Sequence, residues 1–164
     1  MVKTDTIPCS QTFPAGLIGR LGPLGLYHIL TRGSTVLSTK KNFILLKTHQ
    51  RNSFDQAKGI CELISGAVYF PSSLAEIKEV AKIMKNHKET DIYWIWIRLS
   101  DQETEGVWKD PENRETLSFT NWSSGHPNNQ SGRQRWGYMW SNWGGKWGAL
   151  SDGGSTFHIA CELK

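Results

Sequence analysis

Residues 93–108 of this 164-residue chain read YWIWIRLSDQETEGVW, and they divide the chain into two parts of different character. The aromatic and isoleucine side chains of Tyr93–Leu99 predict a strand. Before this segment apolar residues recur with helical spacing, whereas after residue 100 Gly, Asn, Ser and Trp dominate and that spacing disappears. Helices confined to the first part, followed by strands and loops, are typical of the α+β class.

A short apolar strand, Phe43–Leu46, precedes the first expected helix. That helix begins with a capping box, in which Ser53 is the N-cap and Gln56 lies three residues later, and it ends at Gly66. One face of the helix carries the residues Phe54, Ala57 and Cys61.

A second strand, Ala67–Phe70, leads into a second helix with the same kind of start. Ser73 and Glu76 repeat the spacing of the capping box. The apolar residues that follow predict an amphipathic helix packed on the core. They are Ile77, Val80, Ile83 and Met84.

Residues 136–140 and 146–150 predict a β-hairpin, because the glycine pair at 144–145 suits a turn with positive φ. Trp143 lies at this turn, and we expect it to be the most exposed tryptophan. Alternate residues of a strand share a face. The expected faces are Trp136, Tyr138 and Trp140 on one side, and Gly137 and Met139 on the other.

Two cysteines 100 positions apart, Cys61 and Cys161, enclose all eight tryptophans, and the second of them lies in a last strand over 157–163. Distant cysteines around a Trp- and Gly-rich stretch suggest a small oxidised domain, which places the protein in a secreted or extracellular setting. If these two cysteines pair, Cys9 is left over as a free thiol or as an intermolecular bridge.

Residues 1–41 predict a basic arm that contains scattered Gly and Pro, and residues 42–164 predict one folded domain. Residues 1–52 carry seven Lys or Arg against one acid, whereas residues 53–164 carry twelve against fourteen. Such an arm is either a solvated tail or an electrostatic contact for an anionic partner. No apolar run in the sequence is long enough to span a bilayer.

Several motifs, taken in order, resemble those of the C-type lectin-like domain. Trp96–Asp101 resembles the family's Trp-Ile-Gly-Leu motif, with Arg98 in place of its Gly, and Glu105–Trp108 resembles the Glu-Gly-x-Trp that follows. The resemblance covers about residues 43–164. The other matching segments are Leu117–Trp122, His126–Asn128, Gly145–Trp147 and Ile159–Glu162.

This resemblance implies an α+β, double-loop fold with two helices and a small antiparallel sheet, preceded by the arm. It also implies a disulfide between Cys61 and Cys161, and a peptide bond before Pro127 that is often cis in the family.

The resemblance further implies that the family's calcium site is not kept. Sugar-binding members hold calcium with oxygens from the first triplet, from a Glu shortly after it, and from an Asn-Asp after the Trp. Here the triplet begins with His126, a poor ligand for a hard cation, and Gly148 and Ala149 follow the Trp. Only Asn128 remains, and Arg133 and Arg135 stand near the place of the later Glu. We expect no calcium there, no other metal site and no cofactor.

A group of acids follows the strand predicted over Tyr93–Leu99. These acids either form a second cation site or belong to a solvated loop. These acids are Asp101, Glu103, Glu105 and Asp110.

Two functional hypotheses follow. In the first, which we favour, the domain is a protein-recognition or assembly module that uses the arm and the Trp-rich hairpin. In the second, it is a lectin that binds glycans without calcium. In both, aromatic faces and arginines provide the contacts. The candidate binding residues are His126, Asn128, Arg133, Arg135, Trp140 and Trp143.

Other expectations concern modification and chemistry. Asn121 and Asn129 begin N-glycosylation patterns, which occur often by chance. The scattered histidines lack a nucleophile motif, so we do not expect an enzyme. The expected disulfide also argues against a nucleic-acid partner.

Overall fold

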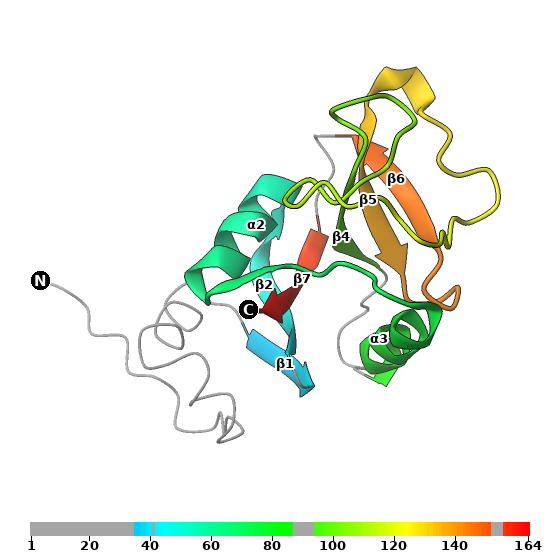
Figure 1. The fold of residues 1–164 in the computed structure, drawn as a ribbon. Helices are drawn as coiled ribbons and strands as arrows, with labels where there is room; N and C mark the ends of the chain where they lie inside the picture. Colours follow the sequence, from blue (N-terminus) through cyan, green and yellow to red (C-terminus); the bar gives the residue numbers. More distant parts are fainter. Residues whose placement is uncertain (1–34, 41, 87–93, 152–155) are drawn as a thin grey trace, which may run out of the picture.

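The computed structural model describes residues 35–40, 42–86, 94–151 and 156–164, which form two antiparallel sheets and two α-helices (Figure 1). The first sheet has the strand order β1-β2-β7-β3 and the second has the order β4-β5-β6. The predicted α+β class is therefore confirmed. The elements are β1 (Thr35–Lys40), β2 (Phe43–Asn52), α2 (Phe54–Leu63), β3 (Gly66–Val68), α3 (Leu74–Asn86), β4 (Trp94–Ser100), the 3-10 turn η1 (Gln130–Gly132), β5 (Gln134–Trp140), β6 (Trp147–Ser151) and β7 (Thr156–Leu163).

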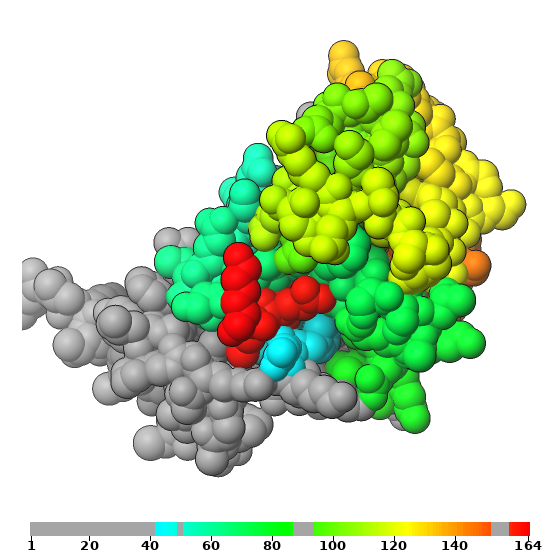
Figure 2. Space-filling model, in the orientation of Figure 1, coloured from blue at the N-terminus to red at the C-terminus, as the bar shows by residue number. Residues whose placement is uncertain are grey.

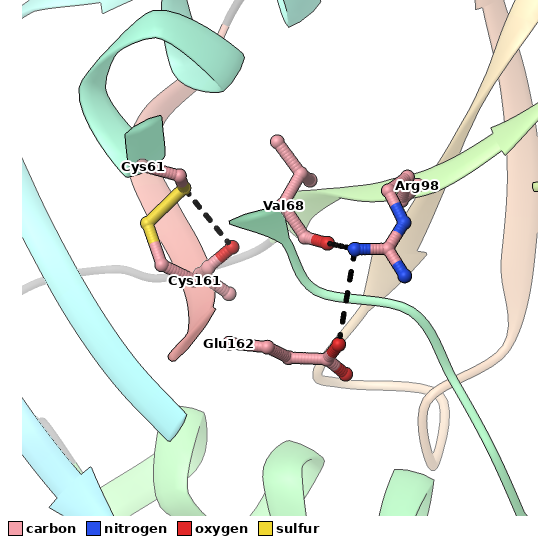
Figure 3. Close-up of a disulfide and its surroundings, with 6 residues drawn as sticks. Cys61, Val68, Arg98, Cys161 and Glu162 are labelled. Carbon is pink, nitrogen blue, oxygen red and sulfur yellow. Dashed lines mark hydrogen bonds and ion pairs between the residues drawn. A yellow bond between two sulfur atoms is a disulfide. The ribbon is translucent and has the colours of Figure 1, made fainter. Parts of the chain in front are cut away.

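Strand β7 joins the early and late parts of the chain, because it lies between β2 and β3 in the first sheet. Cys161 pairs in register with Ile44 on one side and with Val68 on the other. Its sulfur is bonded to Cys61 of α2, with the two Cα atoms 5.5 Å apart (Figure 3). The disulfide expected between these cysteines is thus present, and it fastens α2 to the centre of the sheet.

The start of α2 follows the capping box predicted from the sequence. The Gln56 backbone N–H donates to the Ser53 hydroxyl at 3.3 Å, and the Ser53 N–H donates to the Gln56 side chain at 2.9 Å. After the helix, Gly66 lets β3 approach β7 closely, because a Cβ at this position would lie 2.5 Å from the Glu162 carbonyl oxygen.

Helix α3 is amphipathic, as predicted. The Glu76 backbone N–H donates to the Ser73 hydroxyl at 3.2 Å at its start. The helix packs against one side of the second sheet through the buried residues Ile77, Val80, Ala81 and Met84. Neither α2 nor α3 is long and apolar enough to cross a bilayer.

The second sheet has a different hydrophobic cluster on each face. Trp136 and Tyr138 of β5 belong to the cluster that includes Phe54 and Trp96, whereas Met139 belongs to the cluster that includes Trp147. Phe54 stacks on Trp136 with the ring centroids 3.9 Å apart. The alternation predicted for residues 136–140 is therefore confirmed, and α2 covers one face of the sheet while α3 covers the other.

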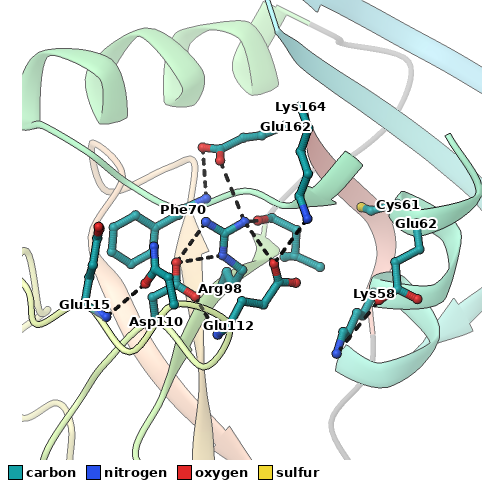
Figure 4. A network of polar contacts seen from close by, with 12 residues as sticks. Lys58, Cys61, Glu62, Phe70, Arg98, Asp110, Glu112, Glu115, Glu162 and Lys164 are labelled. Carbon is teal, nitrogen blue, oxygen red and sulfur yellow. Dashed lines mark hydrogen bonds and ion pairs between the residues drawn. The ribbon is translucent and has the colours of Figure 1, made fainter. Parts of the chain in front are cut away.

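Arg98 replaces the glycine of the family motif and links four segments of the chain (Figure 4). Its Nε and Nη2 atoms lie 2.9 and 2.8 Å from Asp110 Oδ2, and its Nη1 donates to the Val68 carbonyl at 3.3 Å. The same Nη1 lies 3.8 Å from Glu112 and 3.9 Å from Glu162. This guanidinium joins β4 to β3, to β7 and to the long loop, which consists of residues 101–129 between β4 and η1.

The first sheet also includes residues of the expected arm. Strand β1 pairs with β2 from Thr35↔Lys47 to Lys40↔Phe43, so a domain that begins at residue 42 would divide this hairpin. The sequence Thr35–Lys40 is mostly polar, and its strand state depends on the backbone groups of β2 rather than on an apolar run of its own. Cys9 and the glycine-rich part of the arm lie outside the described residues.

Candidate functional site: the long loop and the β5–β6 hairpin

The long loop runs along the open edge of β6. The Trp147 N–H donates to the Asn121 carbonyl and the Ser123 N–H donates to the Trp147 carbonyl, each at 2.9 Å. Further along the strand the Ala149 N–H donates to Nδ1 of His126 at 3.4 Å. These bonds satisfy backbone groups that an edge strand would otherwise expose. The His126–Pro127 peptide bond is cis, as the family resemblance implied.

The first glycosylation pattern is part of this packing. Asn121 is buried, and its side-chain nitrogen donates to the Gly145 carbonyl at 2.8 Å. Ser123 is also buried, and its hydroxyl donates to the Trp147 carbonyl at 2.9 Å. A glycan on Asn121 would replace one of its two amide hydrogens and would need space inside the loop. Glycosylation of Asn121 stays a prediction.

Asn129 has a different environment. It is half-buried, it adopts a positive φ of 43°, and its side-chain nitrogen donates to the Glu105 carboxylate. Its neighbour Asn128 is exposed, and the Asn128 side-chain oxygen accepts from the Gln130 N–H at 3.4 Å. Glycosylation of Asn129 stays a prediction.

A row of aromatic rings ends at the turn of the hairpin. Tyr138 is buried and contacts Trp140 with the ring centroids 5.3 Å apart. Trp140 in turn contacts Trp143 at 4.3 Å, and His126 lies 6.3 Å from the Trp140 ring. Trp143 is 59% exposed, in agreement with its expected position at the turn. The structure therefore brings His126, Trp140 and Trp143 together. The buried Tyr138 ring packs against the rings of His126 and Trp140.

Tyr138 was not among the expected site residues. The strand alternation places it beside Trp140, and this is the signal that would have identified it. Burial raises the pKa of its hydroxyl, so this group stays neutral over the physiological range.

The two arginines of the expected site have different roles. Arg135 faces the loop after β4, where its Nη1 lies 3.4 Å from the Asp101 carbonyl oxygen and 3.8 Å from the Asp101 carboxylate. The Arg135 guanidinium is therefore engaged in a contact within the domain. Arg133 follows η1 and is exposed.

Of the four acids after β4, three are paired with cations of the protein, whereas Glu105 accepts from the Asn129 side-chain nitrogen. Asp101 contacts Arg135 and Asp110 contacts Arg98, while Glu103 lies 3.4 Å from Lys109 and 3.0 Å from Arg114. Among the described residues, no group of three or more His, Cys, Asp or Glu side chains is placed to hold a metal ion.

The side chains at the family's calcium positions do not fit a calcium ion. His126 uses Nδ1 to accept from Ala149, and Gly148 and Ala149 have no side-chain oxygen. A Cβ at residue 148 would lie 2.4 Å from the Tyr138 hydroxyl oxygen, so the tyrosine ring occupies the space beside the strand. Calcium binds six to eight oxygen ligands, several of them charged, and Asn128 alone cannot replace them.

Comparison with known proteins agrees with the fold. The family model described as "Lectin C-type domain" matches residues 50–162. The hepatic lectin of Gallus gallus is 30% identical over 98 residues, which are 59% of this chain and 44% of that protein. This chain therefore matches less than half the length of that relative.

Three solved structures have the same fold. The C-type lectin CEL-I from Cucumaria echinata aligns with a TM-score of 0.66 at 19% identity, over 79% of this chain and 96% of that one. Human lithostathine aligns with a TM-score of 0.64 at 22% identity, over 80% of this chain and 97% of that one. The carbohydrate-recognition domain of the human scavenger receptor C-type lectin aligns with a TM-score of 0.63 at 21% identity, over 77% of this chain and 95% of that one. At these identities the structures show the fold alone. The match of the family model over most of the chain, together with the disulfide and the double-loop fold, shows that this chain belongs to the C-type lectin domain family.

Proposed function

We propose that this domain is a non-catalytic, extracellular recognition module that binds a protein partner without calcium at the family's usual sugar site. Its contact region is the hairpin surface, which consists of His126, Asn128, Arg133, Trp140 and Trp143. The exposure of Trp143, whose ring packs against Trp140, is the observation that carries this proposal.

A tryptophan in this position suits a protein interface. It presents a large apolar area whose orientation is already fixed by its neighbour, so binding costs little side-chain entropy. The exposed Arg133 and Asn128 supply polar groups around it, as at the rim of an interface. The disulfide supports an oxidising compartment, which agrees with an extracellular role.

Glycan binding without calcium is the second candidate function. The observation that favours it is the pair of tryptophan rings, 4.3 Å apart and inclined by 80°, because an exposed aromatic face can stack on a sugar ring. Arg133 would add contacts to acidic glycans.

One pair of variants tests both candidates. The wild-type domain and Trp143→Ala are immobilised, and extracellular fluid and a glycan array are passed over each in EDTA. We expect a protein partner that binds the wild type and is lost with Trp143→Ala. Leu74→Ala is the matched control, because Leu74 is also an exposed apolar residue, 48% accessible, but lies on α3.

The outcomes separate the two functions. Array binding in EDTA that is lost with Trp143→Ala supports the lectin function instead. Binding that needs calcium, or that is equally reduced by Leu74→Ala, contradicts the proposed surface.

We also propose that the arm and Cys9 link copies of the protein. The leftover cysteine and the basic excess of the first 52 residues support this proposal. Light scattering should give an oligomer that Cys9→Ser or a reductant reduces in mass. A protein that is monomeric both with and without residues 1–34 would contradict it.

A further inference from the structure

Helix α3 carries a row of three lysines on the side that faces away from the core. Lys78, Lys82 and Lys85 are exposed, and their spacing of four and three residues places them on one face of the helix. The rise of an α-helix spreads them over about 10 Å. The buried face of α3 packs on the second sheet, so these lysines belong to the surface of the domain.

The acids of α3 lie on a different side of the helix. Glu76 and Glu79 line the groove between α3 and the ends of β2 and β7, and none of the lysines of the row lines that groove. In the space-filling view of Figure 2 the end of β7, the start of β2 and α3 meet on one face of the molecule. The charges of α3 are therefore separated, with the acids toward β7 and the lysines outside this groove.

The turn of the β5–β6 hairpin packs on the start of the same helix (Figure 1). A Cβ at Gly145 would overlap the Ile77 side chain and would lie 3.3 Å from the Ile77 carbonyl oxygen. Lys146 follows Gly145 and is exposed, and so is Lys78, which follows Ile77. The Lys146 N–H donates to the carbonyl of the exposed Trp143 at 3.3 Å. The hairpin surface therefore continues toward the lysines of α3.

These lysines are not neutralised by acids within the described part of the domain. We call the group the lysine surface, and it consists of Lys78, Lys82, Lys85 and Lys146. None of the four makes an ion pair with another described residue. In contrast, Arg98 of β4 lies 2.8 Å from Asp110, and Arg114 of the long loop lies 3.0 Å from Glu103. The cations around the long loop are used inside the domain, whereas the lysine surface is available to a partner.

This arrangement fits a partner that carries carboxylates. We propose that the protein partner of the hairpin surface has an acidic segment, which lies across the lysine surface while Trp143 contacts its apolar side chains. This inference rests on the proposed function of the hairpin surface. Alternate residues of an extended segment are about 7 Å apart, and lysines four residues apart on a helix are about 6 Å apart. Acids at every second position of the segment therefore match the row.

Fluorescence anisotropy in EDTA with two labelled peptides tests this inference. One peptide alternates six glutamates with six glycines, and the other has glutamine in place of every glutamate. We expect the glutamate peptide to bind the wild-type domain about tenfold more tightly than the glutamine peptide at low salt. This difference should become smaller at physiological salt, because exposed charges are screened.

Two triple variants with the same net charge show where the peptide binds. The α3 variant should weaken binding of the glutamate peptide about tenfold, because it removes three exposed contacts between opposite charges. The control variant removes three lysines from β2, α2 and the C-terminus and should have little effect. Thermal melting checks that each is folded. The two variants are Lys78→Gln/Lys82→Gln/Lys85→Gln and Lys47→Gln/Lys58→Gln/Lys164→Gln.

A partner captured by the hairpin surface separates this inference from the proposed function. Loss of that partner with Trp143→Ala but not with the α3 variant overturns the inference and leaves the proposed function standing. If no protein is captured, the proposed function fails, and the peptides decide separately whether the lysine surface binds carboxylates. Leu74→Ala keeps all four lysines and should bind the glutamate peptide as the wild type does.

Three further results overturn the inference. The first is equal binding of the glutamate and glutamine peptides. The second is an equal loss in the α3 variant and the control variant, which would show that only net charge matters. The third is binding of a heparin hexasaccharide that the α3 variant abolishes, without binding of the glutamate peptide, which would assign the lysine surface to a sulfated glycan.

Discussion

The Tyr138 ring occupies the space that a side chain at residue 148 would need. Residue 148 follows Trp147 of β6, and calcium-binding members of the family carry a calcium ligand at this position. The Gly148→Asn substitution restores such a side chain but forces it against the ring, where its Cβ would lie 2.4 Å from the hydroxyl oxygen. We expect the variant to lose about 1–3 kcal/mol of unfolding free energy, and its melting temperature not to respond to calcium.

The matched control for this change is Gly144→Asn. Its Cβ would meet no atom within 4 Å, and asparagine tolerates the positive φ of 64° at this position. Equal losses in the two variants, measured by urea unfolding, would show that the tyrosine does not restrict residue 148.

Glu162 gives the stability of the domain a defined dependence on pH. Burial raises its pKa to about 7 in the folded protein, from 4.5. The folded state therefore binds more protons than the unfolded state between these values, and its stability falls as the pH rises through this window. Glu162→Gln should flatten the dependence between pH 5 and pH 7 and should raise the unfolding free energy at pH 8. Urea unfolding over this range, with Glu62→Gln as the control, measures both effects.

Single side chains were the hardest to predict. The sequence predicts which side chains of β5 share a face, and it predicts the exposure of Trp143. The burial of Asn121 and the pairing of Arg135 with Asp101 depend on how the long loop folds back on β6 and β4, and no local pattern specifies that path.

Helix α2 is an element whose boundaries are determined locally. The reciprocal hydrogen bonds of Ser53 and Gln56 satisfy two backbone N–H donors at its start. Ser53→Ala should therefore lower the unfolding free energy by about 1 kcal/mol. Gln56→Ala should cost less when Ser53 is already replaced, because the two residues act together.

The control for this prediction is Ser124→Ala, at an exposed position of the long loop. Calorimetric melting of the three single variants and the double variant measures the coupling. Additive losses would mean that the two halves of the capping box act independently.

Elements with strong local signals were predicted well, and elements that depend on a neighbour were not. Both helices and the β5–β6 hairpin carry capping boxes, amphipathic spacing or turn glycines. Strand β1 carries none of these signals in its mostly polar sequence, and it pairs along its backbone with β2.

The disulfide closes a loop of 100 residues and joins α2 to β7. In the chain-entropy account such a closure restricts the unfolded state and contributes about 4–5 kcal/mol. The double variant Cys61→Ala/Cys161→Ala should lose unfolding free energy of this order, as measured by urea unfolding. Cys9→Ser is the control, and we expect it to leave the unfolding free energy unchanged.

The position of β7 also limits when the domain can form. Strands β2 and β3 are made early in synthesis, but each borders a strand that the ribosome completes about a hundred residues later. Until residue 163 has left the ribosome, both strands have open edges and Cys61 has no partner in the fold. Contacts of such long sequence separation form slowly. The domain must therefore fold after its synthesis rather than during it, and the nascent chain depends on protection of these edges in the meantime.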